Sequence, residues 1–161
     1  MPLDPSSMVA GFTGLFSGPA LGAFPAAQKM ADIYASYAAL GLFGVNKPIF
    51  TGAEKTMLAN TLAAVFSLPA PNPAAWGTAW SSGLTAFWLA PPIIVTGPAQ
   101  AGLVTAIPGA LSLIGVLAAQ TAAPSNPPPV VAAYLANALH VATLTTLATV
   151  APPPSTIVPL L

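Results

Sequence analysis

The stretch TGAEKTMLANTLAAVFSLPAPNPAAWGTAWSSGLTAFWL, residues 51–89, contains two helix starts separated by a helix stop. Thr51 and Glu54 match a capping box, in which the Thr hydroxyl accepts a hydrogen bond from the third helical amide and the Glu carboxylate reaches back to the cap amide. This start predicts a helix over 52–67. The prolines at 69 and 71 end that helix, because proline is excluded from helix interiors.

The second start is Asn72 followed by Pro73, since proline suits the first turn of a helix. A helix from there to Leu89 places four large side chains on one face, at steps of four. An aromatic stripe at this spacing is more often a core or an interface than a stacking platform for a ligand. We therefore expect a contact between subunits, made by Trp76, Trp80, Leu84 and Trp88.

Proline separates the rest of the chain into segments in the same way, with 20 prolines in 161 residues. Further helices are expected over 25–43, over 108–121 and from the proline run at 127–129 to Val141. β-branched runs over 93–96 and 143–150 predict short extended segments. The sequence thus predicts a mainly α fold, a compact bundle of four or five short helices with Pro-rich connectors, a small β element and an extended C-terminal arm.

We expect a single helical domain over 1–151, with a Gly-rich first part over 9–24, followed by a Pro-rich arm over 152–161. The arm is too short to fold alone. We expect it to dock on a neighbouring subunit as an extended clamp. Its apolar residues are the further candidates for contact between subunits, namely Ile157, Val158, Leu160 and Leu161.

Charge is scarce in this chain and unevenly placed. Charged residues make up 4% of the sequence, against about 25% in a typical soluble domain. All three lysines and all three acidic residues lie within the first 55 residues, and beyond them His140 is the one remaining candidate for a charge near neutral pH. Binding of nucleic acid is not expected, because it depends on clustered Lys and Arg, and the chain has no Arg.

The sequence offers no set of residues for catalysis or metal binding. The chain has no cysteine, and no carboxylate follows Glu54 to orient His140 as a general base. One His and three scattered acids cannot supply the usual three or four metal ligands. We therefore expect no enzyme activity, no catalytic residue, no metal and no cofactor. His140 is expected at the end of an apolar helix, bonded to a backbone carbonyl.

Two classes of protein fit a long apolar sequence without charge. One is a structural subunit whose apolar faces are covered by copies of itself and by other proteins of a particle, found in a virion or in an extracellular particle. The other is a small membrane protein, a pore-former or an anchor. Proline interrupts the apolar segments, and the loops after residue 56 carry no Lys or Arg to set a topology, so the particle is favoured.

The C-terminal half also resembles a known group of proteins. The string WGTAWSSGLTAFWLAPPI, then a Gly-Pro loop, SNPPP, ANALHVATLTTLATV and a PPP tail are similar to small Ala- and Pro-rich structural proteins of contractile phage tails and related injection systems. The similarity covers about Trp76 to Val150. It implies a non-enzymatic particle component whose helices and terminal β arm pack against neighbouring subunits, and it transfers no catalytic residue.

Overall fold

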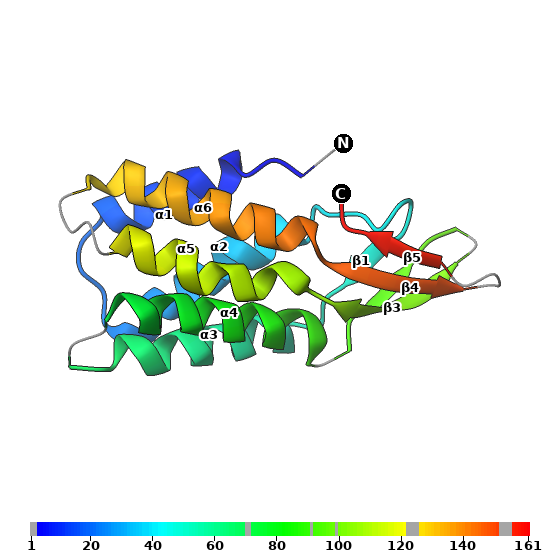
Figure 1. The fold of residues 1–161 in the computed structure, drawn as a ribbon, viewed down its shortest axis with the longest axis horizontal. Coiled ribbons are helices and arrows are strands. Elements are labelled where there is room, and N and C mark those ends of the chain that lie inside the picture. Colours follow the sequence, from blue (N-terminus) through cyan, green and yellow to red (C-terminus); the bar gives the residue numbers. More distant parts are fainter. Residues whose placement is uncertain (1–2, 70–71, 91, 99, 122–125, 152–155) are drawn as a thin grey trace.

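The structure, a computed structural model, describes residues 3–69, 72–90, 92–98, 100–121, 126–151 and 156–161. In this part of the chain, six helices lie side by side along the long axis of the molecule, and a five-stranded antiparallel sheet lies at one end of them (Figure 1). Helix makes up 61% and strand 17%, so the fold is mixed α and β. The prediction of a mainly α bundle with one small β element is therefore wrong.

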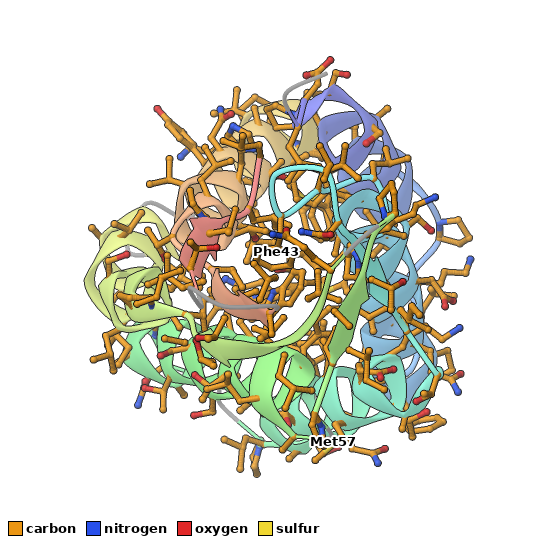
Figure 2. All side chains as sticks on the ribbon, turned by 90° about the vertical axis from the view of Figure 1, so that its right-hand side faces the viewer. Phe43 and Met57 are labelled. Carbon is orange, nitrogen blue, oxygen red and sulfur yellow. The ribbon has the colours of Figure 1, made fainter. Side chains whose placement is uncertain are left out.

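The helices form three antiparallel hairpins, each turning at the end of the molecule away from the sheet (Figure 1). Each helix packs against its neighbours along the chain, and the first also packs against the last, so the six close into a ring (Figure 2). Their bounds are α1 Ser6–Ser17, α2 Ala23–Ala38, α3 Ala53–Phe66, α4 Pro73–Leu89, α5 Ser112–Thr121 and α6 Pro128–Leu144, with a 3₁₀ turn at Pro108–Leu111 before α5.

Proline and its caps position two of these helices where the sequence predicts them. Pro73 occupies the first turn of α4, and the Asn72 side chain accepts a hydrogen bond from the Ala75 amide at 2.7 Å. Pro128 likewise occupies the first turn of α6, which follows Pro127 and has no side-chain cap. The expected helix over 25–43 is shorter than predicted, because α2 ends at Ala38 and a tight turn follows in which Gly44 has a φ of 64°.

Helix α1 lies in the Gly-rich stretch, where no helix was expected. Glycine disfavours a helix by about 1 kcal/mol relative to alanine, so helix propensities alone do not predict α1. The structure shows what the glycine permits, because a Cβ placed on Gly11 would lie 3.0 Å from the Ile33 side chain. Gly11 therefore lets α1 approach α2 closely, and this packing offsets the low propensity.

The five strands come from the connections at one end of the ring. Their bounds are β1 Lys47–Ile49, β2 Ile94–Thr96, β3 Ala101–Ala106, β4 Leu147–Ala151 and β5 Thr156–Pro159. The first strand joins α2 to α3, the next two join α4 to α5, and the last two follow α6. They pair in chain order, each antiparallel to the next. Each hairpin of helices thus contributes one or two strands to a common sheet.

Backbone contacts tie the C-terminus to the segment after α2. Leu42 and Leu161 exchange two backbone hydrogen bonds, of 3.1 and 2.8 Å, and Phe43 forms a β-bridge with Leu160. Phe43 lies near the middle of the ring in Figure 2 and contacts Trp88 edge to face, with ring centroids 6.2 Å apart. The Phe43 side chain is fully buried and therefore fills the junction between the sheet and the helices.

Two segments near the C-terminus differ from the expected ones, the first in its bounds and the second in what it pairs with. The extended run over 143–150 begins later, because Thr143 and Leu144 stay in α6 and β4 starts at Leu147. The C-terminal arm adds strand β5 to the chain's own sheet, where Ile157 pairs with Thr149. The first residues of the expected arm, 152–155, lie outside the described residues.

Candidate assembly surface

The charged residues mark one side of the ring. Lys29 and Asp32 are exposed on α2, and Lys55 is exposed on α3. Asp32 pairs across the two helices with Lys55 at 2.8 Å, rather than along its own helix with Lys29. An exposed pair of this kind contributes only about 0–1 kcal/mol. The α2–α3 side is thus the hydrated side of the molecule, while the described parts of α1, α4, α5 and α6 carry no Lys, Arg, Asp or Glu.

The outward face of the sheet carries a row of five side chains, one from each strand, of which four are large and apolar. The row follows the strand register and consists of Ile49, Ile94, Leu103, Thr149 and Ile157. Its four large apolar members are between 47% and 68% exposed, whereas alternate residues such as Val95 and Val150 are buried. We call these five residues the sheet row. Lys47 is the single charged residue of the five strands.

A row of exposed apolar side chains is unusual on a protein that stays monomeric. Contiguous apolar patches above a few hundred Å² mark sites of interaction. The alternation of buried and exposed residues shows that the row is not needed to fill the core, since the other face of the sheet already does so. The sheet row is therefore the part of the described surface best suited to pack against another protein.

The predicted aromatic ridge lies inside the subunit. Trp80, Leu84 and Trp88 have no exposed surface. Trp76 is half-buried and stacks on Phe66, with ring centroids 5.1 Å apart. The steps of four do bring these side chains to one face of α4, but that face points into the ring, where Tyr34 and Phe12 also pack on Trp80. In this fold they hold the helices together and offer little surface to a neighbour.

The C-terminal candidates fall into two groups. Ile157 is 68% exposed in the sheet row and Leu161 is also exposed, so both are open to a partner. Val158 is half-buried, and Leu160 is fully buried against Gly41, where a Cβ would lie 2.7 Å from it. The inward pair anchors β5 to the subunit and the outward pair extends the apolar surface.

The predicted cap residues surround the start of α3. The Glu54 carboxylate is buried and accepts hydrogen bonds from the amides of Thr51, at 3.1 and 3.2 Å, and Gly52, at 2.9 Å. The Thr51 hydroxyl donates to the same carboxylate at 3.1 Å instead of accepting from the Glu54 amide. Gly52 is the cap residue of the helix, with a φ of 94°. The carboxylate thus satisfies free amides at the helix start, which is a structural role.

A chain of buried polar groups crosses the ring. The Trp88 indole donates to the Tyr34 hydroxyl at 2.8 Å, and that hydroxyl lies 2.7 Å from Thr143 Oγ1. The Thr143 hydroxyl donates its hydrogen bond to the Leu139 carbonyl. The Tyr34 hydroxyl is therefore the donor in the hydrogen bond to Thr143. Burial raises the pKa of Tyr34, because a charged phenolate is costly inside the protein. The chain is therefore neutral, and each of its polar groups is paired.

His140 lies on α6 beside Tyr37, whose hydroxyl is 2.5 Å from Nδ1. The sequence predicts a backbone carbonyl as the partner of His140, whereas in the structure the partner is the Tyr37 phenol. Burial lowers the pKa of His140, while the charge of Asp4 opposes this shift. Within the described residues no three His, Cys, Asp or Glu side chains lie close enough together to hold a metal ion. The pair joins α2 to α6.

Apart from Ile157, the residues of the sheet row are not indicated by the sequence. Its residues come from strands of three to six residues that lie far apart in the sequence, and only their pairing brings them into line. In the part of the chain that the structure describes, no helix is both long and apolar enough to cross a membrane. Comparisons of the chain with protein-family models, with curated proteins and with solved structures found no match.

Proposed function

We propose that this protein is a non-enzymatic structural subunit of a large protein assembly. Its partners are copies of itself and other structural proteins of the same particle. The observation that carries the proposal is the sheet row, four large apolar side chains about half exposed on a rigid face with one charged residue. Covering such a face removes apolar surface from water, which stabilises an interface by about 25 cal/mol per Å².

The architecture supports this role in a second way. The helices close into a ring and the sheet is tied to it through Phe43, so the sheet row has a fixed shape. A fixed surface loses little conformational freedom when it binds, and this loss is a main cost of association. Lasting interfaces are also rich in apolar residues, as this one is.

The kind of particle follows from the sequence. The similarity of about Trp76 to Val150 to structural proteins of contractile phage tails favours a phage virion or a contractile injection particle. A subunit of such a particle needs contacts and shape rather than a reactive site. The paired polar groups around Tyr34 and Glu54 agree with that requirement.

The test compares two double variants in the absence of detergent. Ile94→Lys with Leu103→Lys places two charges in the sheet row, at residues that are about half exposed and need not disturb the core. Thr78→Lys with Ser82→Lys adds the same charge to the exposed face of α4. Size-exclusion chromatography with light scattering should show large species for the wild type and the α4 variant, and much smaller ones for the sheet variant, with circular dichroism unchanged.

Two outcomes count against the proposal. If the folded sheet variant assembles as the wild type does, the sheet row is not the assembly surface. If the wild type stays in solution only with detergent and as a small oligomer, the membrane protein considered from the sequence replaces the particle subunit.

A further inference from the structure

A polar pocket lies in the groove between α2 and α3 and shares no residue with the sheet row. Its volume is about 200 Å³, and it is more enclosed than the two neighbouring hollows that Asp32 also borders. The α2 wall presents residues at steps of four along the helix, and the α3 wall faces it. The residues that define this α2–α3 pocket are Phe24, Gln28, Asp32, Lys55, Thr56 and Asn60.

The two charges of the pocket neutralise each other. Lys55 Nζ lies 2.8 Å from Asp32 Oδ1, and both side chains are about half exposed. Each group can still bond a ligand, because an ammonium has three protons and a carboxylate has two oxygens. A charged ligand would meet attraction from one partner and repulsion from the other. The pair therefore favours a neutral ligand whose groups both donate and accept hydrogen bonds.

Two amides on facing helices of the pocket are open to such a ligand. Gln28 on α2 and Asn60 on α3 are exposed, and within the described residues neither side chain forms a hydrogen bond with the protein. An amide both donates and accepts, as a hydroxyl group does. Hydroxyl groups of a ligand can therefore replace the water that these amides bind, with little loss of hydrogen bonding.

Phe24 adds an apolar face beside these polar groups. It lies in the first turn of α2, and its side chain is 49% exposed. An aromatic ring next to hydrogen-bonding side chains suits a molecule with an apolar face and a polar rim. A pyranose ring has both, since it carries C–H groups on a face and hydroxyl groups around its edge. The pocket is smaller than the roughly 300–1,000 Å³ that drug-sized ligands occupy, which suits one sugar unit.

We propose that the α2–α3 pocket binds one unit of a neutral saccharide. Phe24 covers the C–H face of the sugar, and Gln28 and Asn60 bond its hydroxyl groups from the two helices. The Asp32–Lys55 pair offers an acceptor and a donor to a further hydroxyl group. Because the pocket and the sheet row share no residue, the pocket stays open when the sheet row is covered.

Saturation-transfer NMR of the wild-type chain tests the proposal, because it observes the small ligand whatever the size of the protein. The probes are glucose, galactose and N-acetylglucosamine, each at about 10 mM, since a ligand of this size binds weakly. We expect saturation of the ring C–H protons of at least one saccharide, with little change in about 0.5 M salt because the ligand is neutral. No transfer to any of the three saccharides, or transfer to the zwitterion glycine alone, overturns the proposal.

Two pairs of variants connect the signal to the pocket. Asn60→Ala should weaken binding by about tenfold, whereas Asn137→Ala, on the exposed side of α6, should leave it unchanged. Phe24→Ala should also weaken binding, whereas Tyr134→Ala, at an aromatic side chain that is 47% exposed, should not. All four side chains are exposed, so circular dichroism should match the wild type. Binding that is unchanged in both pocket variants, or equally weakened in the controls, overturns the proposal.

Discussion

Single hydroxyl groups hold the inside of the ring together. The Tyr34 hydroxyl accepts a hydrogen bond from Trp88 and donates one to Thr143, and all three side chains are fully buried. Tyr34→Phe leaves the indole N–H without a partner. We expect it to lower the free energy of unfolding by about 1–3 kcal/mol, the cost of an unsatisfied buried polar group.

Chemical denaturation measures this change, with Tyr134→Phe as the matched control. Tyr134 is exposed, so its variant should stay within about 0.5 kcal/mol of the wild type. Equal effects of the two substitutions would show that the buried hydroxyl contributes nothing.

His140 makes stability depend on pH near neutrality. Its pKa in the folded protein is lowered from the ordinary value of 6.5 because of burial. As the pH falls through 6.5, the unfolded chain therefore takes up the proton before the folded protein does. We expect full stability above that value, and a decline as the pH falls from it toward the folded pKa.

Urea denaturation between about pH 7.5 and pH 5.5 tests this, above the range in which exposed carboxyl groups titrate. His140→Gln should remove most of the decline. A decline of the same size in that variant would assign it to another group.

At the scale of elements, glycines decide how closely helices pack. A Cβ on Gly77 would lie 2.6 Å from the Ile114 backbone oxygen, so α4 and α5 meet at this residue. Gly77→Ala should lower the free energy of unfolding by about 1–3 kcal/mol, because helices that already touch must separate. Gly115→Ala, in α5, meets nothing within 4 Å and should raise it by up to about 1 kcal/mol, the gain in helix propensity.

Thermal or chemical denaturation of the two variants checks the difference in sign. If Gly77→Ala stabilised the protein as Gly115→Ala does, the close contact of α4 with α5 would not exist.

The helices that could be predicted are those with local signals. The cap at Thr51 and Glu54 and the start at Asn72 and Pro73 depend on neighbouring residues, and α3 and α4 begin within a residue of the expected places. Among the strands, β-branched runs indicate β2 and part of β4, but β1 and β3 have no such signal. β1 has three residues with proline in the middle, and β3 contains Gly102, which fits against Thr149 of the next strand. Their pairing depends on contacts far apart in the sequence.

The candidate surface could be predicted only in part. The spacing of Trp80, Leu84 and Trp88 correctly indicates one face of a helix, but a spacing does not tell whether that face points inward or outward. On α6 the same kind of spacing points outward, as the exposed Val141 shows. The direction depends on the closed ring, which no local pattern reveals.

At the scale of the whole molecule, most of the exposed charge lies apart from the sheet row. Lys29, Asp32 and Lys55 lie on α2 and α3, and Lys47 is the single charged residue of the strands. A chain with a net charge of zero has little electrostatic repulsion between copies, which favours association. We therefore expect solvent on the α2–α3 side and protein on the outward face of the sheet.

Sedimentation velocity of the wild-type chain without detergent tests this account most directly. We expect species heavier than the 16.0 kDa chain over a wide range of concentrations, since the sheet row of each copy is open to contact. A single species with the mass of one chain, unchanged as the concentration rises, would contradict it.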